Sequence, residues 1–114
     1  MSISLKISFS EKEDLEYFLN ILYLGGISCI LDNNNKIDDI EYMMFRHGIW
    51  QYFKEKGISE FQLGIMRQGM EIEDISDIAP HYLPIKLSKL KKGLINNINT
   101  KSGTKEISWD INDE

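Results

Sequence analysis

The chain contains 114 residues, of which 42% are hydrophobic and 27% are charged, and its formal net charge is −5. This length favours one domain over two, and the hydrophobic fraction excludes a fully disordered chain. The overall acidity argues against a dedicated nucleic-acid-binding domain, which is usually basic. We therefore expect a single domain over residues 1–114, with flexible last few residues.

Features of the sequence that bear on location favour the cytoplasm. The single cysteine, Cys29, cannot form an internal disulfide, so an oxidising compartment is not indicated. The N-terminal segment MSISLKISFS lacks a basic start followed by a continuous apolar run, so it does not resemble a signal peptide. No stretch approaches the ~20 apolar residues that span a bilayer. We expect a cytoplasmic protein without membrane association.

The choice of residues indicates AT-rich codons. The chain has eighteen isoleucines but no valine, and eleven lysines against two arginines. Such a bias is typical of phage or mobile-element genes. Its structural consequence is that the core has to be built from Ile, Leu, Phe and Met.

The first pattern in chain order predicts a β-strand over residues 3–9. Apolar and polar residues alternate there, which is the period of a strand that buries one face and leaves the other in water. The apolar members are Ile3, Leu5, Ile7 and Phe9.

A helix is expected directly after this strand. Ser10 and Glu13 have the spacing of a capping box, in which each side chain bonds the other's backbone amide. The helix should run to about Leu24, where Gly25-Gly26 would provide a left-handed C-terminal cap. Phe18 and Leu22 of this helix are expected to pack against the apolar side of the first strand, formed by Ile3, Leu5 and Ile7.

The next segments predict a short buried strand at 27–31 and a turn at 32–36. Asn and Asp dominate the turn, and they tolerate positive φ. A second helix is expected from about residue 38, where Asp38-Asp39 suit a helix N-terminus, to Gly57. An alternative makes residues 36–45 a strand that forms a hairpin with 27–31, and the short apolar runs leave it open.

The C-terminal half predicts a strand at 61–66, an irregular or briefly helical segment at 70–83, a helix from Pro84 to about Asn99, and a strand at 107–111. The resulting order is β-α-β-α-β-α-β. This order predicts the α+β class, with a small mixed sheet and helices packed mainly on one of its faces.

No catalytic, cofactor-binding or metal site is expected, and the protein is not expected to be an enzyme. Cys29 could use His47 or His81 as a base, but no motif accompanies these residues. An acidic run has no histidine at metal-ligand spacing and is typical of a solvated face. A small enzyme that uses this run is the third hypothesis. The run comprises Glu71, Glu73, Asp74 and Asp77.

A lysine-rich segment over residues 84–105 carries six lysines and no acidic residue. Nucleic-acid readers normally add arginine and aromatic side chains, which this segment lacks. The pattern favours a solvated face, but it supports the alternative function of a nucleic-acid-associated accessory protein. The candidate basic patch comprises Lys86, Lys89, Lys91 and Lys92.

The predicted second helix has two apolar arcs where a surface helix normally has one. The second arc is either additional core or an exposed patch that docks on a partner protein, and the sequence leaves both open. Its members are Ile40, Met43, Met44, His47 and Trp50.

Together these features favour a small non-catalytic protein-binding inhibitor or adaptor. Examples of this class are a toxin-immunity protein and a phage-encoded inhibitor of a host enzyme. The expected partner is another protein, a toxin or a host enzyme, and the second arc is the expected binding surface. The oligomeric state is left open.

Overall fold

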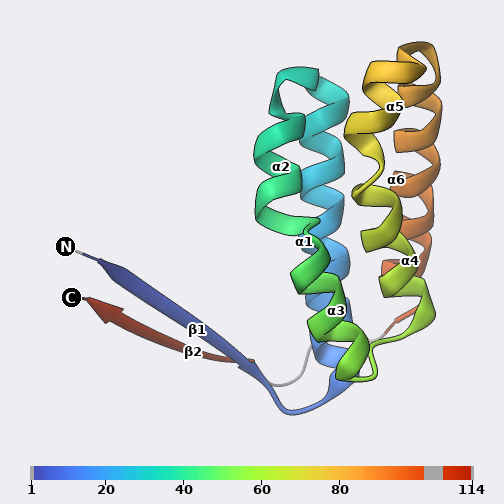
Figure 1. Cartoon of the computed structure of the whole chain (residues 1–114). Helices are drawn as coiled ribbons and strands as arrows, with labels where there is room; N and C mark the ends of the chain where they lie inside the picture. The colour runs from blue at the N-terminus through green and yellow to red at the C-terminus, as the bar shows by residue number, and fades with distance from the viewer. Residues whose placement is uncertain (1, 102–106, 114) are drawn as a thin grey trace.

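The computed structural model describes residues 2–101 and 107–113, and Figure 1 shows the whole chain. The last few residues were expected to be flexible, and one of them, Glu114, lies outside the described ranges. The elements in chain order are β1 (Ile3–Phe9), α1 (Lys12–Asp32), the 3-10 helix η1 (Asn34–Lys36), α2 (Ile37–Met44), α3 (His47–Glu55), α4 (Glu60–Gly69), α5 (Ile72–Ile78), the 3-10 helix η2 (Pro80–Tyr82), α6 (Leu83–Asn99) and β2 (Ile107–Asp113).

The predicted fold class is wrong. The described residues form a helical bundle and one two-stranded antiparallel ribbon, β1 with β2, instead of a β-α-β-α-β-α-β mixed sheet with helices on one face. The first strand, the last strand and the helix from Pro84 are confirmed. The predicted strands at 27–31 and 61–66 are helical, because apolar runs of this length fit a buried helix as well as a strand.

Helix α1 continues through the glycine pair that was expected to end it. A Cβ atom on Gly26 would lie 2.8 Å from the Sδ atom of Met44 and 3.0 Å from Cγ2 of Ile40. The glycine therefore permits close packing of α2 on α1 and does not cap a helix. Ile27 and Ile30 lie three residues apart and are both fully buried, which is the helical period.

The predicted helix over 38–57 is two helices, and the hairpin alternative for 36–45 is wrong because α2 occupies that segment. The break falls at Phe45, whose φ of −121° and ψ of 58° are not helical. The Phe45 ring is 3% exposed and lies 5.4 Å from the Tyr23 ring, measured between centroids. The chain leaves the helical path where this ring enters the core.

Helix α4 replaces the strand expected at 61–66. Ser59 precedes the helix, and its hydroxyl oxygen accepts a hydrogen bond from the Gln62 backbone N–H at 3.4 Å, which caps the N-terminus. The buried side recurs at helical spacing, through Gln62, Ile65, Met66 and Gly69.

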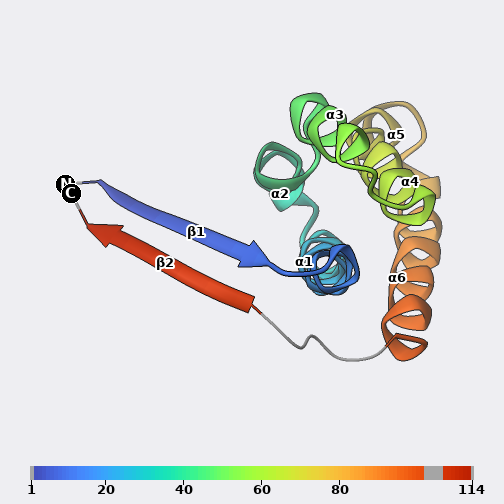
Figure 2. The ribbon, with the colours of Figure 1, turned by 90° about the horizontal axis from the view of Figure 1, so that it is seen from below.

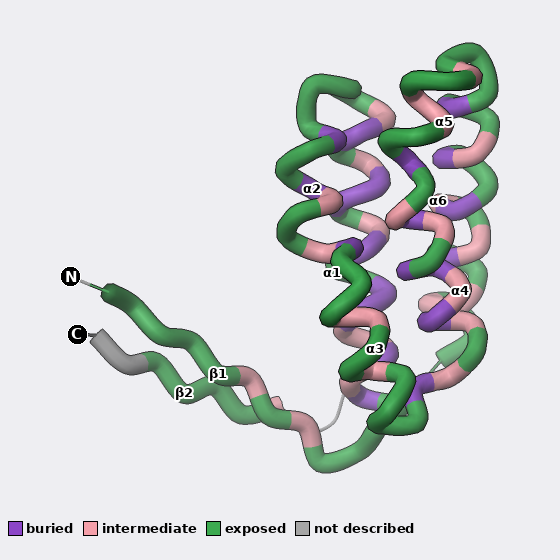
Figure 3. The backbone as a smooth tube through the Cα atoms, in the orientation of Figure 1, coloured by how far each residue is buried: buried purple, intermediate pink, exposed green. Residues whose placement is uncertain are grey.

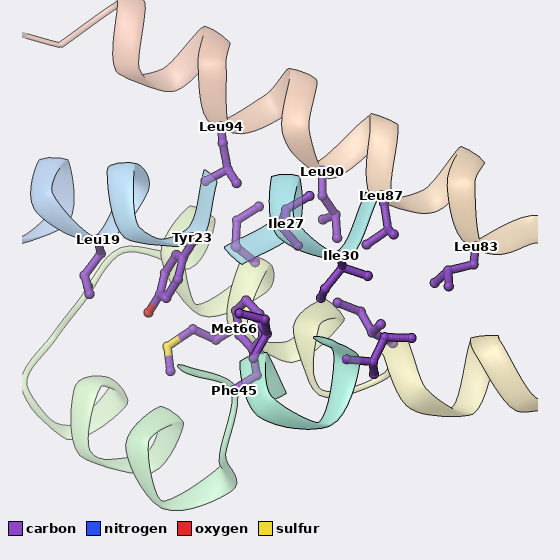
Figure 4. Packing of buried hydrophobic residues seen from close by; sticks show 14 residues of the cluster. Leu19, Tyr23, Ile27, Ile30, Phe45, Met66, Leu83, Leu87, Leu90 and Leu94 are labelled. Carbon is purple, nitrogen blue, oxygen red and sulfur yellow. The ribbon is translucent and has the colours of Figure 1, made fainter. Parts of the chain in front are cut away.

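The core lies between α1, α6 and the layer formed by α2, α4 and α5 (Figure 4). Helix α6 contributes a leucine at each turn, and all four are at most 4% exposed. Met66 and Phe45 fill the space opposite, as the close-up shows. The leucines are Leu83, Leu87, Leu90 and Leu94.

A buried polar network, not anticipated from the sequence, joins α1, α4 and α6. Gln62 donates through Nε2 to the Oδ1 atom of Asn20 and to the carbonyl oxygen of Glu16. Asn20 in turn donates through Nδ2 to Oδ1 of Asn97 at 2.8 Å. Because buried amides are costly unless paired, these bonds fix the relative positions of the three helices.

The ribbon projects away from the bundle in both views (Figures 1 and 2). Its base packs on α1, where the Phe18 ring lies 5.3 Å from Phe9 and 6.5 Å from Trp109, between centroids. Further out the ribbon is exposed (Figure 3), with Ile3 at 69% and Leu5 at 54%. Phe18 thus packs on the first strand through Phe9. The predicted packing of Leu22 on the strand and the predicted burial of Ile3 and Leu5 are wrong, because all three side chains are exposed.

Helix α1 is also, among the described helices, the one that is long and apolar enough to cross a membrane by length and composition. In this structure it is the central helix of the bundle. Its Leu19, Tyr23, Ile27 and Ile30 side chains belong to the core, and its Asn20 side chain bonds α6.

Candidate partner-binding surface

The break between α2 and α3 separates the five residues that were expected on one arc. Ile40 is a core residue, 7% exposed, and Met44 is half-buried next to Gly26. Met43 is 60% exposed, and His47 is also exposed. Trp50 is half-buried and packs against the core. The structure thus divides the set between core and surface.

Cations and aromatic rings pair along the exposed sides of α2 and α3. The Arg46 guanidinium lies 4.6 Å from the centre of the Tyr42 ring, and the Lys54 ammonium lies 4.9 Å from the centre of the Trp50 ring. His47 stacks on Trp50, with ring centroids 5.6 Å apart. We call this the α2–α3 surface: Tyr42, Met43, Arg46, His47, Trp50 and Lys54.

The sequence contains a signal for these pairs that the two-arc interpretation missed. Tyr42 with Arg46, and Trp50 with Lys54, are four residues apart, and side chains at that spacing are neighbours on a helix. Each exposed cation–π contact contributes about 0.5–1 kcal/mol. The contacts hold the long cationic side chains over the rings, which makes the surface more ordered than free lysines and arginines would be.

An acidic groove of about 400 Å³ borders this surface, between α2 and the start of α5. The Oε1 atom of Glu41 accepts a hydrogen bond from the Glu73 backbone N–H at 2.9 Å. Partial burial raises the pKa of Glu41, and repulsion from Glu73 and Asp38 acts in the same direction, although the hydrogen bond opposes it. The carboxylate is thus held at this position at an electrostatic cost.

This raised pKa gives a prediction for Glu41→Gln. The folded state binds the proton of Glu41 more tightly than the unfolded state, so the contribution of Glu41 to stability increases as the pH falls toward 4.5. The variant, which resembles the protonated form, is expected to be at least as stable as the wild type at pH 7. Its advantage should shrink on acidification. Urea unfolding at pH 7 and pH 4.5 measures the two differences.

Glu60→Gln on α4 is the control for the loss of one negative charge. A Glu41→Gln variant whose stability relative to the wild type is the same at both pH values would contradict the prediction.

The residues of the other predicted sites lie on separate elements. Cys29 is exposed on α1, His47 is on α3 and His81 is in η2. The four acidic residues of 71–77 are exposed on and beside α5, whose Ile72 is buried. No group of three His, Cys, Asp or Glu side chains within the described ranges is arranged to hold a metal ion.

The four lysines of the candidate basic patch do not share one side of α6, because Lys86 and Lys91 flank its buried leucines on opposite sides. Lys89 and Lys92 are exposed, and Lys86 and Lys91 are half-buried. An open, mainly apolar hollow beside them is lined by Pro84, Ile85 and Ser88 together with Lys89 and Lys92. The patch is therefore a mixed surface of lysine ammonium groups and their apolar stems.

The fold defines a small helical-bundle protein with a projecting β-ribbon. Residues 10–110 match the family described as "Protein of unknown function (DUF3969)", and the chain belongs to that family. No curated protein and no solved structure matches the chain.

Proposed function

We propose that this protein is a non-catalytic protein-binding inhibitor or adaptor that contacts its partner through the α2–α3 surface. The observation that carries the proposal is the exposure of Tyr42 and Met43, at 68% and 60%, beside the ordered cations Arg46 and Lys54. Aromatic residues, Met and Arg are enriched at the centres of protein interfaces. A toxin or a host enzyme remains the proposed kind of partner, and the cytoplasmic location remains a prediction.

The charges of the surface suggest the chemistry of the partner. Four cationic or titratable nitrogen groups surround the Trp50 and Tyr42 rings in a protein with a net charge of −5. They are Arg46, His47, Lys54 and Arg67. A partner surface with carboxylates around an apolar centre would complement them, because opposite charges steer association and fix orientation.

The test compares partner capture by the wild type with capture by Met43→Ala and Tyr42→Ala. Removing an exposed hot-spot side chain costs about 2 kcal/mol or more of binding, roughly thirtyfold in affinity. The melting temperature should change little, because both side chains are mainly exposed. Ile85→Ala on α6, which truncates a side chain that is 50% exposed, is the matched control and should leave capture unchanged.

A captured protein is then purified and titrated with the wild-type chain. Loss of its activity at a one-to-one ratio supports an inhibitor, and retained activity in a stable complex supports an adaptor. Capture that survives both α2–α3 substitutions would contradict the proposal. Binding to DNA or RNA with a steep salt dependence, lost on charge reversal at Lys89 and Lys92, would favour the nucleic-acid alternative instead.

A further inference from the structure

The projecting ribbon has one apolar face and one polar face. In the antiparallel register Leu5 is opposite Ile111 and Ile7 is opposite Trp109, and directly opposite residues share a face. The polar face carries Ser4, Ser8 and Ser108, with Lys6 opposite Asp110. The outer part of the apolar face is uncovered. Its exposed fractions are 69% for Ile3, 54% for Leu5, 57% for Trp109 and 63% for Ile111.

An exposed apolar face of this kind is normally covered by another structural element or by a partner. A two-stranded ribbon is marginally stable on its own in water, and it normally gains stability from a third strand or from packing on another element. Here Phe18 covers the base, while the ribbon beyond it extends away from the helices (Figures 1 and 2). Four large apolar side chains on a narrow arm form a patch of the kind that marks an interaction site.

A groove of about 540 Å³ opens at the corner where the ribbon joins the bundle. Ile7 and Phe9 of the ribbon form one wall, and Leu15, Tyr52 and Phe53 of the helices contribute to the other. We call it the corner groove. Glu11, Lys12 and Lys56 also line the groove, so it has both apolar and charged walls. It continues the apolar face of the ribbon, and the two together form one L-shaped surface.

We propose that a second copy of this chain covers this surface. The two ribbons stack with their apolar faces together and run in opposite directions about a two-fold axis, and the tip of each ribbon enters the corner groove of the other. Ile3 of one protomer then lies near Phe9 and Phe53 of its partner. A two-fold interface uses the same surface on both copies, so that surface has to be self-complementary.

The dimensions of the ribbon fit this arrangement. Phe9 and Ile3 are six residues apart, or about 20 Å along a strand. An antiparallel stack of two such ribbons therefore places each tip over the base of the other. Stacked sheets are about 10 Å apart.

The area of contact is sufficient for a specific dimer. The four outer residues are each more than half exposed, and together they leave a patch on the order of 400 Å² uncovered on each ribbon. Two stacked ribbons with two filled corner grooves bury about 1,000 Å² in total, which is at the lower limit of specific interfaces.

The local charges also allow two copies to meet, although the whole chain is acidic. The exposed fractions given above belong to uncharged side chains, and on the opposite face Lys6 is paired across the ribbon with Asp110. On the contact face Asp113 is opposite Ile3 at the ribbon tip. The corner groove that the tip enters is lined also by Glu11, Lys12 and Lys56, so the contact includes charged groups of both signs. The dimer would present two α2–α3 surfaces. The dimer proposal does not depend on what those surfaces bind.

Sedimentation velocity of the full chain across the micromolar range tests the proposal. We expect the wild type to sediment as a dimer. Leu5→Asp places a carboxylate in the stacked face and should raise the dissociation constant at least roughly thirtyfold. Ser4→Asp is the matched control, because it adds the same charge at the adjacent residue on the polar face, and it should leave the dimer unchanged.

A second variant and a fluorescence measurement distinguish loss of the dimer from loss of the fold. Ile3→Asp at the ribbon tip replaces Leu5→Asp if circular dichroism shows that the latter loses its helices. In a Trp50→Phe background, the emission of Trp109 should shift to shorter wavelength as the dimer forms. A wild type that stays monomeric, or a dimer that Leu5→Asp and the control Ser4→Asp weaken equally, overturns the proposal. A monomer that binds phosphatidylcholine vesicles through Leu5 assigns the face to lipid and also overturns it.

Discussion

Replacing Ile30 with alanine is expected to lower the free energy of unfolding by about 2–5 kcal/mol. Ile30 is fully buried in α1 and belongs to the core cluster with Ile27, Leu87 and Leu90 (Figure 4). The substitution removes most of a buried side chain and leaves a cavity that the surrounding helices fill only in part. Urea unfolding followed by circular dichroism measures the loss.

Cys29→Ala, at the neighbouring exposed position, is the control and should change stability by less than about 0.5 kcal/mol. Ile27→Ala should cost as much as Ile30→Ala, because the helical period places both residues on the buried side. A strand would place Ile27 and Ile30 on opposite faces. If only one of the two substitutions is costly, the helical assignment of this segment is contradicted.

The segment around Ile30 shows why the central part of the fold could not be predicted from the sequence. Gly25-Gly26 followed by the largely apolar run Ile-Ser-Cys-Ile-Leu predicts a helix end and a buried strand when only local signals are used. The residues that pack against this part of the helix are distant in the sequence. Met44 and Ile40 of α2 fill the space that the absent Cβ atom of Gly26 leaves, so Gly26 permits close helix packing, whereas no atom lies within 4 Å of a Cβ position on Gly25.

The elements that were predicted correctly are those with strong local signals. Alternation over 3–9 and 107–111 gave the two strands, and Pro84 with a leucine at each turn gave α6. The pairing of the two strands was not predictable, because their partners are about a hundred residues apart in the chain. Their alternation indicated a buried face, whereas the structure leaves that face exposed on a projecting ribbon.

The candidate surface was predicted in part. Met43 and His47 are exposed as a binding patch requires, but Ile40 belongs to the core and Trp50 packs against it. The division runs within each helix, because Ile40 and Met43 are both on α2 while His47 and Trp50 are both on α3. Local patterning identified residue types that are common at binding surfaces, and tertiary packing decided which of them are exposed.

Gly69→Ala is expected to destabilise the protein by about 1–3 kcal/mol, although alanine favours helices over glycine. Gly69 is buried at the end of α4, and a Cβ atom there would overlap the ring of Phe45. Phe45 is 3% exposed and stacks near Tyr23, so its ring cannot turn toward solvent without leaving the core. Thermal and urea unfolding of the purified variant measure the effect.

Gly64→Ala on the same helix is the matched control. No atom lies within 4 Å of the position its Cβ would take, so this variant should gain up to about 1 kcal/mol from helix propensity. In a Gly69→Ala, Phe45→Leu double variant, the narrower leucine should relieve the overlap, and the combined loss should be smaller than the sum of the two single losses. Equal stability of the Gly64→Ala and Gly69→Ala proteins would show that Phe45 has room to move. The break between α2 and α3 would then not be fixed by the contact of this ring with α4.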